Sequence, residues 1–310
     1  MSEKIVVTGG AGYVGSVLVP HLLASGYRVR VLDNLRFGGE ALLPNFIHPN
    51  FSFAEMDVLD AGGVEREVAD ADAVVHLAAL VGYPICKKLP DEARRTNLDG
   101  TRTVLDSLRP QTRLIYFSTG SNYGEVVGVC DEDTPLNPLS LYGETKTEAE
   151  QMCMARPNSV ALRFATAFGL SPRLRLDLMI NDFTYQALVN RYLLVYERHF
   201  RRTFIHVTDM ARVVPHLLRN WDRARDRRLN VGHETMNFTK EDITRLLQTK
   251  MNFHLYFADV GKDEDHRDYE VSYARIRELG FEIEVDINRG LDELIHGLQL
   301  VRMRNPYSNV

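Results

Sequence analysis

Tyr142 and Lys146 stand four residues apart in the segment Leu141-Tyr142-Gly143-Glu144-Thr145-Lys146, and together they have the chemistry of a proton-transfer pair. Positions four residues apart lie on the same face of a helix, so the phenol and the ammonium are neighbours there. A free tyrosine has a pKa of about 10, and a nearby positive charge favours its phenolate. The pair therefore indicates a base that takes a proton from an alcohol, or returns it to a ketone. An isolated pair of this spacing is often only a solvated helix face, so its context matters.

Thr119 supplies a hydroxyl in the same part of the chain. It follows the apolar run at 113–117, at the point where a strand is predicted to end. We expect this hydroxyl to hold the substrate oxygen in line with the phenol of Tyr142.

A glycine-rich loop near the N-terminus indicates the oxidant. Gly9, Gly12 and Gly15 follow a predicted strand at 5–8 and accompany a predicted helix at 13–25. Glycines let the backbone turn tightly and approach a pyrophosphate, which then lies at the helix N-terminus. A single glycine motif is weak evidence, but the flanking strand and helix support a dinucleotide site. With the Tyr/Lys pair, the loop predicts redox chemistry on an alcohol or ketone.

Asp33 ends the second predicted strand, 18 positions after Gly15. A carboxylate there accepts hydrogen bonds from the adenosine ribose and repels a 2′-phosphate, which favours NAD over NADP. Arg36 is near enough to soften that discrimination. Asp57, after the third strand, is placed to meet the adenine amine. A turn or capping role is the alternative for both aspartates.

The first half of the chain alternates short apolar runs with helical patterns, which is typical of βα units in a parallel sheet. The fold class is therefore α/β, a Rossmann-type doubly wound parallel sheet with a smaller C-terminal substrate-binding lobe. We assign residues 1–164 to an NAD-binding domain, to which 206–229 return, and 165–205 and 230–310 to the lobe. Substrate is expected between the two, above the carboxyl ends of the strands. The predicted strands are 5–8, 28–32, 51–55, 73–77, 113–117 and 160–164, and 91–108 is predicted as one long helix.

Composition excludes several classes of protein. The 310 residues are 45% hydrophobic and 25% charged with a net charge of −5, so no basic surface calls for nucleic acid or anionic lipid. The first strand leaves no room for a signal peptide, and no apolar run approaches the ~20 residues that span a bilayer. We therefore expect a cytoplasmic protein with no membrane or nucleic-acid partner.

The cysteines and histidines do not have metal-ligand spacing. Cys86, Cys130 and Cys153 lie far apart without a C-x-x-C motif, so we expect buried free thiols. His76 and His206 stand at a strand end and in an apolar strand, where packing or cofactor contact is the better interpretation. No metal site is expected.

These motifs, in this order, resemble the extended short-chain dehydrogenase/reductase superfamily of sugar-nucleotide epimerases and dehydratases, nearly end to end. The resemblance implies tightly held NAD(H), a nucleotide-diphosphate sugar as substrate, and a homodimer packed through helices near 91–108 and 142–155. It rests on residues 8–15, Asp33-Asn34, His76-Leu77-Ala78-Ala79, Asn97, Phe117-Ser118-Thr119, residues 142–146 and residues 204–209. The cofactor-binding residues that it implies are Gly9, Gly12, Tyr13, Val14, Gly15, Asp33, Asn34, Asp57, Val58, Leu77, Ala78, Ala79, Asn97, Ser118, Tyr142 and Lys146.

The residues after Thr119 bear on the reaction. Dehydratases of this superfamily carry an Asp-Glu pair there, whereas this chain has Gly120 and Ser121. That leaves oxidation or reduction at carbon 4, or 4-epimerisation through a transient ketone. The stretches 168–183 and 199–207, with Leu80-Val81-Gly82, resemble a subgroup of bacterial GDP-heptose 4-dehydrogenases from capsular pathways, acting on GDP-D-glycero-alpha-D-manno-heptose. This resemblance implies NAD-dependent oxidation at carbon 4 of a GDP-heptose or related sugar.

Two alternatives stay open at this stage. A 4-epimerase returns its hydride in each cycle, whereas a net dehydrogenase must release NADH or discharge it, for instance to a 2-oxo acid. A non-catalytic NAD sensor is the second alternative, although such proteins usually lose the Tyr/Lys pair.

The resemblance also implies the substrate contacts. Arg202 and Arg267 correspond to two arginines that grip the diphosphate, which suits the fork of a guanidinium; a solvated surface Arg is the alternative. Thr166 and Asp177 stand where other members have Asn, and Asp177 is a candidate acceptor for the N1–H and amine of guanine. The substrate-binding residues expected in all are Val81, Gly82, Thr119, Ser121, Thr166, Asp177, Leu178, Arg202 and Arg267.

Overall fold

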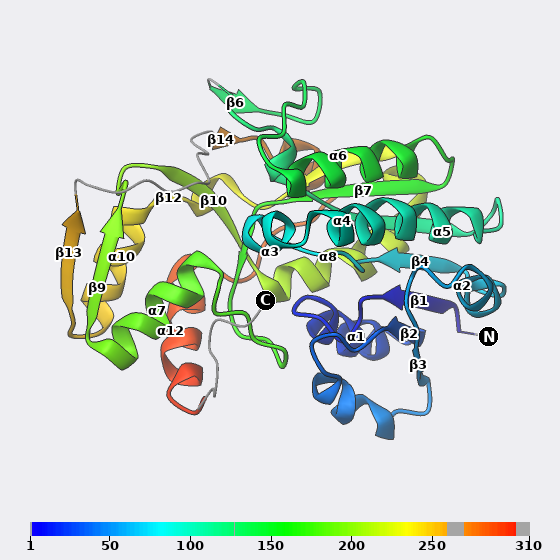
Figure 1. Cartoon of the computed structure of the whole chain (residues 1–310), viewed down its shortest axis with the longest axis horizontal. Helices are drawn as coiled ribbons and strands as arrows, with labels where there is room; N and C mark the ends of the chain where they lie inside the picture. The colour runs from blue at the N-terminus through cyan, green and yellow to red at the C-terminus, as the bar shows by residue number, and fades with distance from the viewer. Residues whose placement is uncertain (1, 127, 259–269, 302–310) are drawn as a thin grey trace.

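The computed structural model describes residues 2–126, 128–258 and 270–301. Its centre is a seven-stranded parallel sheet with the strand order β11-β7-β5-β4-β1-β2-β3 (Figure 1). The strands are β1 (Lys4–Thr8), β2 (Arg28–Asp33), β3 (Phe51–Glu55), β4 (Ala73–His76), β5 (Arg113–Thr119), β7 (Ser159–Phe164) and β11 (Arg227–Val231). The α/β, doubly wound fold predicted from the sequence is confirmed.

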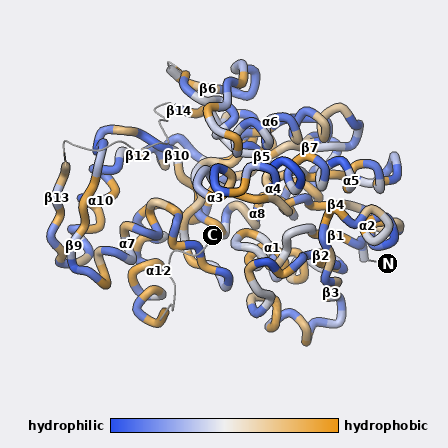
Figure 2. The backbone as a smooth tube through the Cα atoms, viewed as in Figure 1, coloured by the Kyte–Doolittle hydropathy of each residue, from blue (hydrophilic) through white to orange (hydrophobic). Residues whose placement is uncertain are grey.

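Helices cover both faces of this sheet because its inner strands are apolar on both sides. Ile5 and Val7 pack into the hydrophobic cluster on one face, and Val6 between them packs into the cluster on the other. The apolar character of β1 and β4 is visible in Figure 2. The first cluster includes α1 (Gly15–Ala24) and α8 (Val207–Arg219), and the second includes α2 (Ala61–Val68), α5 (Gly100–Asp106) and α6 (Leu141–Met154).

A smaller lobe lies beside the sheet, at the left of Figure 1. Its core gathers Phe168, Phe204 and Leu291 from three distant parts of the chain. The lobe contains β8 (Thr166–Phe168), β9 (Tyr192–Tyr196), β10 (Arg201–His206), β12 (Asn237–Thr239), β13 (His254–Ala258), α7 (Met179–Asn190), α10 (Lys240–Lys250) and α12 (Ile287–Leu298). The remaining elements are β6 (Val129–Cys130), β14 (Glu270–Val271), α3 (Tyr83–Lys88), α4 (Pro90–Arg94), α9 (Trp221–Ala224), α11 (Ala274–Glu278), η1 (Glu40–Ile47), η2 (Arg95–Asp99), η3 (Gly120–Asn122) and η4 (Glu234–Met236).

The packing differs in one place from the residue ranges assigned from the sequence. Ile276, Leu279 and Phe281 lie in the hydrophobic cluster of α1 and α8, although 230–310 were assigned to the lobe. The strand β11 also continues to Val231 in the large sheet. Long-range packing, which sequence periodicity does not record, places these residues. The two-part division itself stays our proposal, with 270–281 moved to the larger part.

The long helix predicted over 91–108 is confirmed as a continuous helical run from Pro90 to Asp106, but its middle is not α-helical. The middle is η2, a π-helical turn between α4 and α5. Such turns often mark functional positions because they rotate the side chains that follow. Here the turn contains Asn97, whose role is described below. No helix in the described ranges is long and apolar enough to cross a membrane.

Candidate active site

A cavity of about 1200 Å³ opens at the carboxyl ends of the sheet strands and is also lined by the lobe. All but one of the predicted site residues that the structure describes line it, from Gly9 and Asp33 on the sheet to Arg202 on the lobe. The exception is Asn97, and Arg267 lies outside the described residues. A cavity of this size and position is where ligands bind in open α/β sheets.

The glycine loop forms a cradle that side chains would fill. Gly9 has φ +72°, and a Cβ there would lie 2.7 Å from the backbone nitrogen of Ala78. A Cβ on Gly15 would lie 2.5 Å from the Cα of Gly10. Both positions need glycine, and both face backbone that cannot give way. The space kept open at the N-terminus of α1 fits a cofactor pyrophosphate.

Asp33 occupies the end of β2, as the sequence predicts. Its two carboxylate oxygens accept backbone N–H bonds from Ala11 and Leu35, each at 2.9 Å. Burial raises the pKa of Asp33, and these N–H donors and the nearby Arg173 oppose that rise. The oxygens retain lone pairs for ribose hydroxyls. Asn34 and Asp57 line the cavity next to Asp33, and the side-chain amide of Asn34 donates to the carboxylate of Asp57 at 2.9 Å.

A buried chain of hydrogen bonds fixes the loop after β4. Thr101 donates to the carbonyl of Asn97 at 2.6 Å, so Nε2 of His76 carries the proton that Thr101 accepts at 3.0 Å. Nδ1 of His76 then accepts from Thr8, which accepts the N–H of Ala78. Burial lowers the pKa of His76 to about 3, so the ring is neutral. His76 thus packs behind the cavity wall and positions Ala78.

Asn97 also acts behind the wall. Its side chain accepts the N–H of Leu80 at 2.8 Å and donates to the carbonyl of Leu80 at 3.1 Å. It also donates to Thr145 on α6 at 3.0 Å. The π-helical turn aims this amide inward, so Asn97 joins the loop lining the cavity to the helix that carries Tyr142. Asn97 does not line the cavity, and its direct contact with the cofactor stays a prediction from the resemblance.

The helix α6 presents Tyr142 and Lys146 to the cavity. Its N-terminus is capped by Ser140, whose hydroxyl accepts the N–H of Gly143 at 3.1 Å. Lys146 is 3% exposed, and its ammonium lies 4.1 Å from the centroid of the Tyr116 ring. Burial lowers the pKa of Lys146 to about 7. The charged form of Lys146 is therefore held at a cost, which the nearby carboxylate of Glu150 partly offsets.

Thr119 lies across the cavity at the end of β5. Its hydroxyl accepts the N–H of Ser121 and donates to Oγ of Ser121, both at 3.1 Å. This small turn fixes the direction of the hydroxyl. It lines the same cavity as Tyr142.

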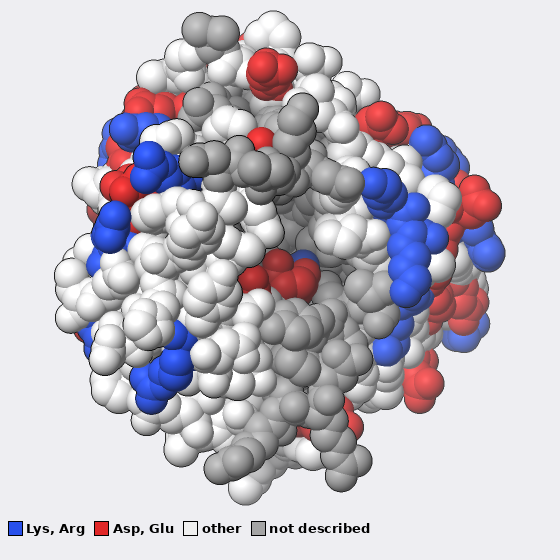
Figure 3. Space-filling view, turned by 60° about the vertical axis from the view of Figure 1, so that its left-hand side comes forward, with Lys and Arg blue, Asp and Glu red and all other residues white. Residues whose placement is uncertain are grey.

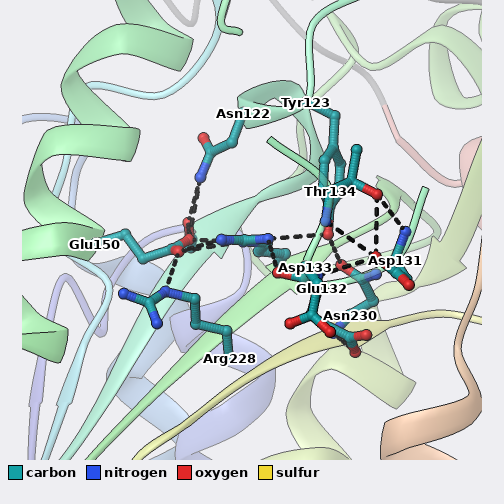
Figure 4. Close-up of polar contacts among 11 residues, drawn as sticks. Asn122, Tyr123, Asp131, Glu132, Asp133, Thr134, Glu150, Arg228 and Asn230 are labelled. Carbon is teal, nitrogen blue, oxygen red and sulfur yellow. Dashed lines mark hydrogen bonds and ion pairs between the residues drawn. The ribbon is translucent and has the colours of Figure 1, made fainter. Parts of the chain in front are cut away.

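Glu150 anchors these parts from inside the protein. Its fully buried carboxylate accepts Oγ–H of Ser118 at 2.6 Å and Nη2–H of Arg163 at 2.6 Å. Asn122 and Arg228 also donate to it, and both point toward it in Figure 4. Glu150 is not among the site residues predicted from the sequence. The sequence signal that could have identified it is its position four residues after Lys146, on the same face of α6.

Residues 169–177 form a segment that the sequence left as irregular. It closes over the glycine loop, since the hydroxyl of Tyr13 donates to the carbonyl of Gly169 at 2.8 Å and Ser171 donates to the carbonyl of Tyr13 at 2.7 Å. Arg175 lines the cavity and forms a two-point ion pair with Asp177, at 3.1 and 2.5 Å. Arg173, Arg175 and the nearby Asp182 line the cavity but were not among the predicted residues.

Comparison with known proteins identifies the family of this chain. The family model of the "NAD dependent epimerase/dehydratase family" matches residues 5–232. The chain belongs to this family. It is 29% identical to UDP-glucuronic acid decarboxylase 1 of Xenopus tropicalis over 312 residues, covering 95% of this chain and 72% of that protein.

Solved structures of the family have the same fold. The UDP-glucuronic acid 4-epimerase of Bacillus cereus, in complex with UDP-glucuronic acid and NAD, is 25% identical, with a TM-score of 0.85 over 96% of this chain and 99% of that one. The dTDP-glucose 4,6-dehydratase DesIV of Streptomyces venezuelae, with NAD bound, is 26% identical, with a TM-score of 0.82 over 96% of both chains. The chain is thus an NAD-dependent enzyme of the extended short-chain dehydrogenase family, and its cofactor is NAD.

Metal-binding side chains and cysteines were the other candidates for chemistry in the sequence. No three metal-binding side chains converge within the described ranges. Cys86, Cys130 and Cys153 are free and buried, as the sequence predicts. Charged side chains of both signs occur on the face in Figure 3, in keeping with the net charge of −5.

Proposed function

We propose that this enzyme oxidises carbon 4 of a nucleotide-diphosphate sugar, with a GDP-heptose as the best candidate. One observation carries the proposal. Thr119, Tyr142 and Lys146 line the cavity that also contains the glycine cradle, and the two residues after Thr119 are Gly120 and Ser121. The proton-transfer group is present, whereas the acid pair that would eliminate water is not. The resemblance of residues 168–183 and 199–207 to GDP-heptose 4-dehydrogenases supports the choice of sugar.

Tyr142, Lys146 and Thr119 each have a separate role in the proposed reaction. The phenolate of Tyr142 takes the proton of the C4 hydroxyl while the C4–H bond breaks. Lys146 stabilises that phenolate by its charge, and the hydroxyl of Thr119 turns its proton from Oγ of Ser121 to the substrate oxygen and so holds that oxygen in line. NAD, when bound, accepts the hydride. Because Lys146 and Thr119 are already held in place by the fold, they need little rearrangement when the transition state forms.

The substrate contacts follow from the lining of the cavity. Arg202, only 9% exposed on β10, is our candidate for the diphosphate, and Thr166 of the neighbouring β8 lines the same cavity. Val81, Gly82, Ser121 and Leu178 line the sugar end as further candidates. Arg267, outside the described residues, stays a prediction from the resemblance.

A 4-epimerase is the second candidate, and one feature favours it. The hydrogen bonds from Tyr13 and Ser171 fasten residues 169–171 over the glycine loop. A covered cofactor suits an enzyme that returns its hydride in every cycle. For a dehydrogenase, the same cover would favour reoxidation of the bound cofactor by a 2-oxo acid, which would take up a hydride and a proton to become a 2-hydroxy acid. We further propose a cytoplasmic homodimer that packs through the helices at 91–108 and 142–155.

Mass spectrometry of nucleotide sugars tests the proposal. The protein is incubated with NAD, a 2-oxo acid and, separately, GDP-, UDP-, CDP- and dTDP-sugars, including a GDP-heptose. Loss of two hydrogens from one of them supports 4-oxidation. An unchanged mass with a new chromatographic peak means epimerisation, and loss of water means dehydration.

A further inference from the structure

Asp182 is an acidic side chain of the cavity that the proposed chemistry does not use. It lies in the first turn of α7, and α7 packs against β9 in the lobe. The cavity wall around it includes Phe183 and, on β9, Val195 and Tyr196. Apolar and aromatic side chains thus accompany Asp182 in the lining of the cavity, and Asp177 is the other carboxylate nearby.

The two acidic residues of this wall differ in their partners. Both oxygens of Asp177 are taken by the guanidinium of Arg175, at 3.1 and 2.5 Å. Asp182 accepts one amide hydrogen from Gln186 at 3.3 Å, and within the described ranges no basic side chain pairs with it. Burial raises the pKa of Asp182 to about 6, so the group is mainly anionic at neutral pH and faces the cavity at a cost. A ligand with adjacent N–H donors would remove that cost.

The order of groups in a nucleotide sugar places its base near this carboxylate. With the sugar at Tyr142 and the diphosphate at Arg202, the nucleoside extends into the lobe between α7 and β9. This step rests on the proposed function. Guanine presents two adjacent donors, N1–H and the exocyclic amine, which match the two oxygens of a carboxylate. Uracil and thymine present one N–H between two carbonyl oxygens, which a carboxylate repels.

We propose that Asp182 binds the N1–H and amine edge of guanine and so selects a GDP-linked sugar. From the sequence, Asp177 was the candidate acceptor for these guanine hydrogens. We assign that role to Asp182 because both oxygens of Asp177 are paired with Arg175. A site built around a buried acceptor discriminates strongly against ligands that leave it unpaired.

Calorimetric titration of the NAD-loaded protein with GDP, IDP and UDP tests this assignment. IDP keeps N1–H and lacks the amine, so the wild type should bind it about tenfold more weakly than GDP, as one lost hydrogen bond predicts. Asp182→Asn should weaken GDP about 10- to 100-fold and bring the GDP/IDP ratio close to one. Asp222→Asn, a change of the same charge at an exposed site, should leave both affinities unchanged. Melting curves establish that each variant is folded.

The outcomes separate this inference from the proposed function. An unchanged GDP/IDP ratio in folded Asp182→Asn overturns the inference, as does wild-type binding of UDP as tight as GDP. Loss of the ratio in Asp177→Asn but not in Asp182→Asn assigns the base to Asp177 and also overturns it. If GDP selectivity depends on Asp182 while no GDP-sugar is oxidised, the inference stands and the proposed reaction fails.

Discussion

The buried carboxylate of Glu150 accepts a hydrogen bond of 2.6 Å from the hydroxyl of Ser118. Glu150 lies on α6 with Tyr142 and Lys146, and Ser118 precedes Thr119 on β5. The bond therefore joins the element that carries the proton-transfer pair to the strand that carries the substrate-orienting hydroxyl. The rate of reaction depends on the separation between these two elements, because small misplacements of reacting groups lower the rate by large factors.

Replacing Glu150 by Gln tests this positioning role. The amide would turn N–H donors toward the donors of Asn122 and Arg163, which now meet a carboxylate. We expect a loss of about 3 kcal/mol in the free energy of unfolding, since breaking a buried pair leaves an unpaired charge. At a temperature where the variant is folded, kcat should fall about tenfold or more with KM little changed. Arg228→Lys, at the exposed edge of the cluster, should change both quantities far less; an equal effect would contradict the role of Glu150.

Tyr142→Phe separates the enzyme from a cofactor sensor. The phenyl ring keeps the packing of α6 but cannot exchange a proton, so turnover should fall about 10³-fold. NAD binding, measured by titration, should stay within about threefold of wild type because the glycine cradle and Asp33 are intact. Unchanged turnover in this variant would exclude Tyr142 as the base.

The buried Lys146 predicts how the stability of the cofactor-free protein depends on pH. Burial lowers the pKa of Lys146 from 10.5 to about 7, so between these values the unfolded chain holds a proton that the folded chain has released. The free energy of unfolding should therefore rise as the pH is raised from 7 toward 9. Urea titrations at pH 7, 8 and 9 measure it.

The matched variant for that measurement is Lys146→Met, which removes the charge and fits an apolar site. Its free energy of unfolding should be higher at pH 7 and lack the Lys146-dependent rise. Lys88→Met, at an exposed position on α3, should follow the wild-type curve. A wild-type rise that persists in Lys146→Met would assign the pH dependence to another group.

Asp33→Asn tests the choice of cofactor. The amide keeps the shape of the side chain but loses the negative charge that repels a 2′-phosphate. The NAD/NADP affinity ratio, measured by fluorescence titration of the reduced forms, should fall about tenfold, since one charge interaction is worth about 1 kcal/mol or more near a surface. A ratio that does not change would place the discrimination elsewhere, for instance at Arg173.

The parts of the site that follow from local sequence were predictable. The glycine spacing, the strand-end Asp33 and the helical spacing of Tyr142 and Lys146 are short-range patterns that the structure brings to one cavity. The parts that depend on contacts between distant segments were not. Asn97 turns inward because a π-helical turn interrupts its helix, and no periodicity announces that turn. The ion pair of Arg175 with Asp177 belongs to a segment without regular structure, so the sequence could not show that Asp177 already has a partner.

The fate of the C4 hydrogen tests the central claim most directly. A GDP-heptose that carries deuterium at carbon 4 is incubated with the protein, NAD and a 2-oxo acid, and the products are analysed by mass spectrometry. We predict a 4-keto sugar without deuterium and a 2-hydroxy acid that carries it. Deuterium retained at carbon 4 of an inverted sugar, with no labelled hydroxy acid, would contradict the account and establish an epimerase.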